Sequence, residues 1–235
     1  KYFNIKNQSR TNLKVLQFRS SIVHHCELKL VKDKIKNLIL ENKLNNGYLF
    51  CPNQFWQHKN HENLVEAFNI FKINNPDNNL KLIFSGNKYD SSTGKETFDR
   101  VFNKINTFKN KYDYLYFENL SFLEMQSLFS GALAVVNPSF YEGWSTTIEE
   151  ARAFKIPTLL SNIKVNIEQN PPNAFFFNPN SVNDIYMQIE NLVCKSNIGK
   201  KYLPLNLSEE RLTLSTLTNS HKELKFYGDR FIAIC

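Results

Sequence analysis

The sequence predicts an α/β fold in which helices cover a doubly wound, open parallel sheet. Three observations lead to this prediction. Short apolar runs alternate along the chain with longer segments of helical periodicity. The short runs are apolar at nearly every position, which is typical of parallel strands that are buried on both faces. The repeated order of strand, helix and strand implies right-handed crossovers between parallel neighbours.

The expected elements follow in chain order. Residues 13–18 form either a strand or an extended linker, and an amphipathic helix follows over about residues 26–44. Six buried strands are then expected, at residues 48–51, 82–84, 114–117, 134–136, 158–160 and 175–177. Helices are expected over residues 61–73, about 95–109, 122–129, 147–154 and 182–194. After residue 196 the strand pattern is lost, and a last helix is expected through Leu224, Tyr227 and Phe231.

The composition indicates a globular protein of a reducing compartment. The chain has 29 basic and 22 acidic residues, a net charge of +7, but its lysines are dispersed. The four cysteines form no C-x-x-C pair, which argues against a metal site and a disulfide framework. No window approaches the roughly 18 apolar residues that a spanning helix needs. We therefore expect a cytoplasmic protein with at most peripheral membrane contact and, since residue 1 is not Met, part of a longer chain.

The candidate site lies where strands end, because ligands of open parallel sheets bind at the carboxyl ends of strands. After the strand at 134–136, a short loop carries Glu142 and Gly143, and a helix begins near Ser145 or Thr146. Thr146 and Glu149 have the spacing of a capping box. Free backbone N–H groups at this helix start favour a diphosphate, and Gly143 lets the backbone approach it closely.

Glu150 lies about one turn inside the same helix. A carboxylate there can accept two hydrogen bonds from a ribose diol, as the acidic residue of dinucleotide sites does. The alternative is that Glu149 and Glu150 only complement the helix dipole as first-turn acids. We adopt that alternative for Glu149 and the ribose-binding role for Glu150.

A second candidate segment follows the strand at 48–51. Lys59 directly precedes a helix start at which Asn60 is the expected N-cap, so its full charge adds to the partial charge of the helix. His58 and His61 lie three residues apart, but without a third ligand they are more often capping or solvated, and we expect no metal. A third strand end adds a tight turn at Gly86, a weaker candidate for donor contact.

These segments resemble a known family. The E-x7-E segment of group 1 (family 4) retaining glycosyltransferases, which have the GT-B fold, is similar to NPSFYEGWSTTIEEARAFKIPTLLS, where Glu142 and Glu150 are the two acids. The family's segment after the first donor-domain strand resembles CPNQFWQHKNHENLVEAF. Residues 165–179 resemble the mannosyltransferase-like members. The likeness covers about residues 45–195, with the motifs in the expected order.

The resemblance implies a role for each matched residue. Lys59 would neutralise the donor diphosphate, Glu142 would contact or orient the donor sugar, and Glu150 would hold the ribose hydroxyls. Leu120 falls where the family contacts the base through the main chain. The remaining residues implied to line the phosphate and sugar are Gly143, Trp144, Ser145, Thr146 and Thr147. The resemblance implies no catalytic metal and no cofactor besides the nucleotide-diphosphate sugar, which acts as donor substrate.

Three departures from the family pattern bear on the chemistry. An arginine about five residues before the lysine is common in the family, but Gln54 stands there. Glu118 takes the place of the usual glycine of the base-binding loop, and residues 144–146 replace small or proline residues. Losing one donor to a developing anion typically reduces the rate by about 100-fold or more.

The resemblance also implies a division of the chain and a set of partners. Residues 1–45 correspond to the interdomain linker and first helix, 46–195 to the nucleotide-sugar-binding domain, and 196–235 to a C-terminal helical segment. An N-terminal Rossmann-like domain would supply the acceptor side of the crevice. The acceptor would be a glycan or a lipid-linked molecule.

Two other functions are compatible with parts of the sequence. A freestanding module could bind a nucleotide sugar without transferring it, and only the presence of an acceptor domain separates this alternative from the enzyme. A nucleic-acid-binding domain rests on net charge alone. Glu142 and Glu150 argue against it, because a polyanion site has little use for carboxylates in its crevice. We therefore expect a nucleotide-sugar donor and no nucleic acid.

Overall fold

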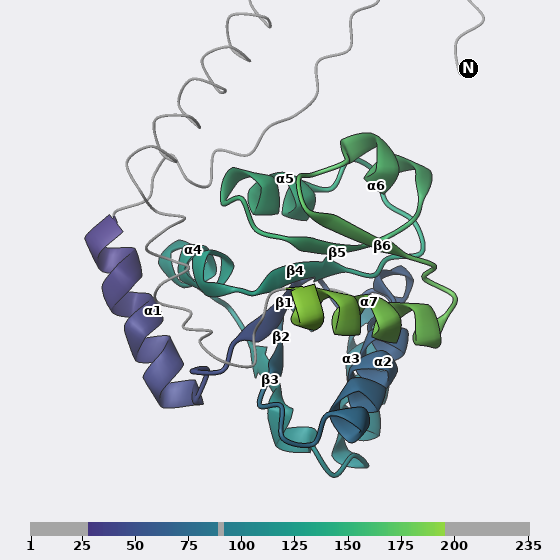
Figure 1. Ribbon diagram of the computed structural model, residues 1–235, viewed down its shortest axis with the longest axis horizontal. Coiled ribbons are helices and arrows are strands. Elements are labelled where there is room, and N and C mark those ends of the chain that lie inside the picture. The colour runs from purple at the N-terminus through teal and green to yellow at the C-terminus, as the bar shows by residue number, and fades with distance from the viewer. Residues whose placement is uncertain (1–27, 89–91, 196–235) are drawn as a thin grey trace, which may run out of the picture.

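The computed structural model describes residues 28–88 and 92–195. Six strands form one sheet in the order β3-β2-β1-β4-β5-β6, and every neighbouring pair is parallel. This confirms the predicted doubly wound α/β fold (Figure 1). The strands are β1 Tyr48–Pro52, β2 Lys81–Ser85, β3 Tyr114–Phe117, β4 Ala134–Asn137, β5 Thr158–Ser161 and β6 Ala174–Phe177. All six were predicted, with ends correct to within one residue.

The predicted helices are also present among the described residues. They are α1 Leu28–Asn42, α2 His61–Asn74, α3 Ser92–Asn106, α4 Phe122–Gly131, α5 Thr146–Ala153 and α7 Val182–Lys195. One further helix, α6 Lys164–Gln169, was not predicted, and two single 3-10 turns occur at η1 Gln57–Lys59 and η2 Lys111–Asp113. The segments at 13–18 and 196–235, with Leu224, Tyr227 and Phe231, lie outside the described residues.

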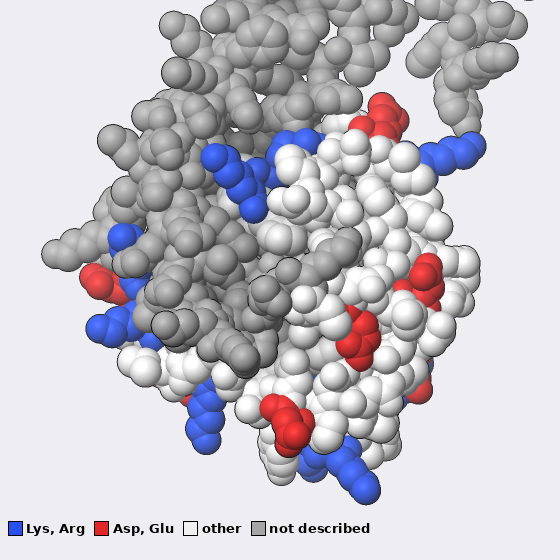
Figure 2. All heavy atoms as spheres, in the orientation of Figure 1, with Lys and Arg blue, Asp and Glu red and all other residues white. Residues whose placement is uncertain are grey.

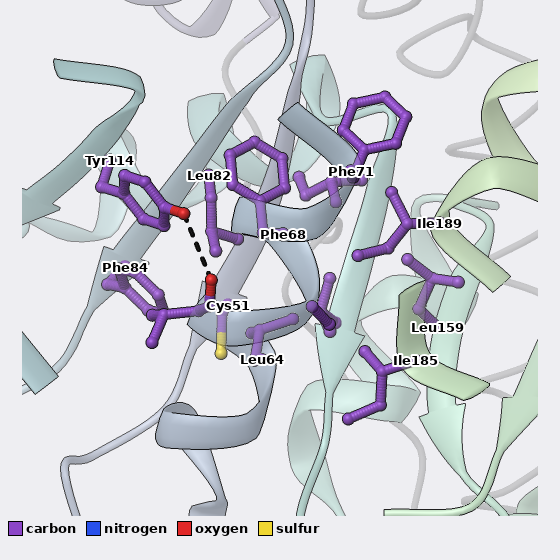
Figure 3. Packing of buried hydrophobic residues seen from close by; sticks show 14 of the residues in the cluster. Cys51, Leu64, Phe68, Phe71, Leu82, Phe84, Tyr114, Leu159, Ile185 and Ile189 are labelled. Atoms are coloured by element: carbon purple, nitrogen blue, oxygen red, sulfur yellow. Dashed lines mark hydrogen bonds between the residues drawn. The ribbon is translucent and has the colours of Figure 1, made fainter. Parts of the chain in front are cut away.

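Side chains alternate between the two faces of the sheet and build two cores. Leu49 and Cys51 of β1 pack with helices α2, α3 and α7, whereas Tyr48 and Phe50 pack with α1, α4 and α5. Figure 1 shows these two groups of helices on opposite sides of the sheet. In the first core, α2 packs against α7, and the Tyr114 hydroxyl donates a hydrogen bond to a backbone carbonyl of α2 (3.2 Å; Figure 3). Helices on both faces explain why the strands are apolar throughout.

The strand order reverses between β1 and β4, which lie side by side at the centre of the sheet. The loops that leave these strands lead to helices on opposite faces of the sheet, which in open parallel sheets is where a ligand-binding crevice is expected at the carboxyl edge. Asn60, which directly precedes α2, joins the loops by donating to the carbonyls of Pro138 (3.0 Å) and Pro179 (2.8 Å). Its position before the helix confirms the N-cap prediction, but its side chain makes no capping bond.

Charged side chains of both signs are scattered among uncharged ones on the face shown in Figure 2. Within residues 28–88 and 92–195, no helix combines the length and apolar character that crossing a membrane requires.

Candidate active site

Two side chains of the predicted site meet across the crevice between β1 and β4. Lys59 donates to Oε1 of Glu142 over 2.6 Å, although 83 residues separate them in sequence. Only 12% of the Lys59 side chain and 10% of the Glu142 side chain are exposed. The ion pair is therefore largely shielded from water. Charges attract each other more strongly in such a low-dielectric environment than at the surface.

The preceding residues on both loops form a second contact. The rings of His58 and Tyr141 stack with their centroids 4.4 Å apart and their planes at 19°. The backbone N–H of Phe140 donates to the carbonyl of His58 over 2.8 Å. Burial, followed by the nearby charge of Lys59, lowers the pKa of His58, so its imidazole is uncharged near neutral pH. The two loops are thus joined by a backbone bond, an aromatic stack and an ion pair in succession.

Ser139 is a site residue that the sequence analysis missed. It is fully buried, and its hydroxyl oxygen lies 2.6 Å from Oε1 of Glu142 and 2.7 Å from Oδ1 of Asn137. Asn137 in turn donates through Nδ2 to the Ser145 hydroxyl over 3.1 Å. This chain of polar contacts fixes Glu142 relative to the start of α5. The only local signal for it was a pair of polar residues at the end of an apolar strand.

The start of helix α5 differs from the prediction. Ser145 is the N-cap, and the expected capping box between Thr146 and Glu149 is not formed. Instead, Gln169 accepts from the Ser145 N–H and donates to the Ser145 carbonyl, both over 3.0 Å. Glu149 is buried and holds Gln169 and Arg152. In place of the capping box, the Gln169 side chain from helix α6 bonds to both Ser145 and Glu149.

One N–H of the predicted diphosphate cradle is therefore already occupied, that of Ser145. The next N–H groups, those of Thr146 and Thr147, belong to the first turn, where no intrahelical acceptor exists. Thr147 is buried and Thr146 is exposed. An anion can still approach the helix start at these two positions.

Glu150 lies in the second turn of α5 and is half-buried. Burial raises its pKa to about 7 from an ordinary value of 4.5. Within the described part of the chain, its carboxylate has no ion-pair partner and no hydrogen-bond donor. A carboxyl group in this state gains from any ligand that offers hydroxyl donors, because such bonds favour its charged form.

The two predicted glycines have different environments. Among the described residues, a Cβ on Gly143 would have no neighbour within 4 Å, so that part of the molecule leaves room for an approaching ligand at this loop. At Gly86, where φ is 149°, a Cβ would overlap the backbone carbonyl of Asn53. Gly86 therefore has a structural reason to be glycine, the close packing of the loops after β1 and β2.

Three other residues named from the sequence have separate environments. Leu120 is half-buried and packs against the second core, and Trp144 is half-buried. The indole N–H of Trp144 has no acceptor among the described residues. Gln54, which stands where the family commonly has an arginine, accepts from the backbone N–H of Asn87 over 2.6 Å. It joins neighbouring loops and carries no charge for a phosphate.

The expectation that His61 is capping or solvated is wrong. It is 1% exposed, and its ring stacks on Phe55 with centroids 4.5 Å apart. Burial, with a smaller contribution from Lys59, lowers its pKa to about 3. His61 is thus a neutral core residue. Among the residues that the structure describes, no three His, Cys, Asp or Glu side chains are grouped so that they could hold a metal ion.

Comparison with known proteins identifies relatives of this chain. Residues 32–202 match the family model described as Glycosyl transferases group 1. The O-antigen chain mannosyltransferase RfbU of Salmonella typhimurium is 26% identical over 157 residues, which are 67% of this chain and 41% of that protein. The chain thus spans about two fifths of the length of this curated relative.

Solved structures share the fold. A UDP-forming α,α-trehalose-phosphate synthase of Burkholderia xenovorans matches with a TM-score of 0.65 and 14% identity, over 94% of this chain and 50% of that one. The sucrose-phosphate synthase of Thermosynechococcus elongatus matches with a TM-score of 0.61 and 18% identity, over 88% and 51%. At such identities the likeness concerns the fold, which is that of GT-B glycosyltransferase domains. Because the family model covers more than half of the chain, including all six strands and both crevice loops, this chain belongs to the group 1 glycosyltransferases.

Proposed function

We propose that this chain is the donor-binding part of a retaining glycosyltransferase that transfers a hexose from a nucleotide-diphosphate sugar. The observation that carries the proposal is the meeting of Lys59 and Glu142 in the crevice, with Glu150 in the second turn of α5. A cation suited to a diphosphate and two carboxylates suited to hydroxyl groups are thus offered along one edge of the sheet. Similarity to a mannosyltransferase supports a hexose as the group transferred.

Each side chain has a distinct part in the proposed reaction. The diphosphate binds to Lys59 and to the first-turn N–H groups of α5, while Glu150 accepts from the ribose diol. Gly143 lets the donor approach, and Trp144 and Leu120 contact the sugar and base regions. The bond between the anomeric carbon and the diphosphate breaks as the acceptor oxygen bonds to that carbon, and the proton of the acceptor hydroxyl passes to the departing diphosphate. Lys59 and the helix start stabilise the negative charge that develops on the departing diphosphate.

The acceptor side comes from a second, N-terminal Rossmann-like domain in this proposal. The chain spans 41% of the mannosyltransferase and 50% of the trehalose-phosphate synthase, which supports a partner domain of similar size. The acceptor is a glycan or a lipid-linked molecule, and retention of configuration follows from the family resemblance. No metal or further cofactor takes part.

Calorimetric titration with UDP, GDP and ADP tests the proposal directly. We expect saturable binding of one nucleotide and at least about tenfold weaker binding by Glu150→Ala, because two hydrogen bonds to a charged group are lost. Glu168→Ala, on the exposed side of α6, is the matched control. Equal affinity for the wild type and Glu150→Ala would rule out the ribose-binding role. Glu142→Ala should still bind the nucleotide but lose sugar transfer.

One observation favours a binding module without transfer activity. Lys59 is the only Lys or Arg in the two crevice loops, residues 53–60 and 138–145, and it is already paired. Little uncompensated positive charge is therefore left for a leaving group. Incubation of the sugar nucleotide with a protein that also contains the proposed acceptor-side domain separates the two functions, because a module would bind the sugar nucleotide without releasing sugar to any acceptor or to water.

A further inference from the structure

We infer that the Lys59–Glu142 ion pair makes the crevice prefer an intact sugar nucleotide over the free nucleoside diphosphate that transfer leaves behind. This inference rests on the proposed function, and it adds a specificity role to the pair. The ion pair would favour the sugar nucleotide because any diphosphate that binds Lys59 must first displace the Glu142 carboxylate from it.

The two crevice loops supply little positive charge. Lys59 is the one Lys or Arg in the two crevice loops, Gln54 is neutral and bonded to the Asn87 N–H, and His58 is uncharged near neutral pH. Within these two loops, a diphosphate that binds at the start of α5 therefore finds only Lys59 as a side chain with a full positive charge. The helix dipole contributes only about half an elementary charge.

A diphosphate that approaches Lys59 meets the carboxylate of Glu142. The Glu142 carboxylate lies 2.6 Å from the ammonium group, and both side chains are about nine-tenths buried. A phosphate that approaches Lys59 is thus brought close to a carboxylate in a region poorly screened by water. Like charges at such distances repel strongly. The phosphate and the Glu142 carboxylate therefore cannot both form a close ion pair with Lys59 at the same time.

Moving Glu142 away from Lys59 is unfavourable. Its Oε1 accepts from Lys59 and lies 2.6 Å from the buried Ser139 hydroxyl, so turning away gives up both contacts. A partly buried carboxylate without donors is unfavourable. The sugar hydroxyls of an intact sugar nucleotide can donate new hydrogen bonds to Glu142, whereas a nucleoside diphosphate has no hydroxyl groups in that region. Only the intact donor therefore compensates Glu142 for releasing Lys59.

Selectivity is a difference between two affinities, and here an unfavourable contact with the product creates it. The expected consequence is easy release of the nucleoside diphosphate after transfer. The carboxylate then returns to Lys59 and restores the empty crevice.

The experiment measures calorimetric affinities of the wild type and Glu142→Gln for UDP, GDP and ADP and for UDP-glucose, GDP-mannose and ADP-glucose. Glutamine keeps the size of the side chain and an oxygen for Ser139, but removes the charge. We expect the variant to bind the preferred nucleoside diphosphate about tenfold more tightly and to lose most of the preference for the sugar nucleotide. Glu66→Gln, which removes one carboxylate from the Lys104 ion pair between α2 and α3, is the control for net charge.

Each outcome decides the matter. If Glu142→Gln gains no more affinity for the diphosphate than Glu66→Gln, the inference is overturned while nucleotide binding by the wild type upholds the proposed function. If neither the wild type nor any variant binds a nucleotide, the proposed function fails and the inference with it. Circular dichroism establishes that the variants fold, and Glu142→Ala, which also removes the charge, must show the same gain for the diphosphate.

Discussion

Glu150 combines a half-buried position with an ionisable group that has no partner among the described residues. Its pKa of about 7 means that between about pH 5 and 7 the folded protein holds a proton that the unfolded chain has released. Stability from this group is therefore full below pH 4.5 and is lost as pH rises through 7. A ligand hydroxyl that donates to the charged carboxylate lowers the pKa and expels the proton.

We predict that nucleotide binding at pH 7 releases a fraction of a proton, and that Glu150→Gln abolishes this release. Calorimetry in two buffers of different ionisation enthalpy measures the number of protons. In parallel, the unfolding free energy of the wild type should fall from pH 5 to 7 relative to that of Glu150→Gln. Proton release that persists in Glu150→Gln would contradict the assignment.

The two crevice glycines provide a contrast between binding and folding. In Gly143→Ala the new methyl group meets no atom of residues 28–88 and 92–195 within 4 Å, so stability should change by no more than about 0.5 kcal/mol while donor affinity falls. Gly86→Ala strains a left-handed backbone and overlaps the Asn53 carbonyl, so we expect a loss of about 3 kcal/mol or more. Urea denaturation and nucleotide titration of both variants check these outcomes. Unchanged nucleotide affinity in Gly143→Ala would remove this loop from the donor site.

At the scale of elements, helix α6 fixes the start of helix α5. Gln169 accepts from the N–H of Ser145 and donates to its carbonyl and to Glu149, so it replaces a local cap with a contact from a different helix. The backbone of Gln169 also accepts from Arg152. The orientation of the proposed phosphate-binding helix start therefore depends on helix α6, which follows strand β5 in the chain.

We predict that Gln169→Leu destabilises the protein by about 1–3 kcal/mol, because it leaves the Ser145 N–H and the buried Glu149 carboxylate without this partner. It should also weaken nucleotide binding through the displaced helix start. Urea denaturation measures the first effect and calorimetry the second. Gln57→Leu, at an exposed site, serves as the control and should leave stability nearly unchanged. A variant as stable as the wild type would show that α5 does not need this cap.

At the scale of the whole molecule, the six strands were predictable because an apolar run is a local property of the sequence. The short helix α6 was missed because six residues give too little periodicity to recognise. The capping box failed for a different reason: a tertiary contact from 20 residues away outcompeted the local pairing of Glu149. The environment of His61 likewise depended on rings brought together only by folding.

For the candidate site, the sequence could name residues but not their contacts. Glu142, Glu150 and Lys59 could be named from their positions after strands, since the carboxyl ends of parallel strands share one edge. The pairing of Lys59 with Glu142 and the stack of His58 on Tyr141 could not be foreseen, because each spans 83 residues of sequence. Ser139 escaped notice because its role depends on where Glu142 points.

The join between the two crevice loops has a consequence for recognition kinetics. Because a backbone hydrogen bond, a ring stack and an ion pair hold the loops together without a ligand, their conformational entropy is lost during folding rather than during binding. The proposed donor therefore meets loops that are already ordered. In the proposed two-domain enzyme, a slow step in forming the complete complex comes from the approach of the acceptor-side domain or from the release of Lys59 by Glu142, and not from ordering of these loops.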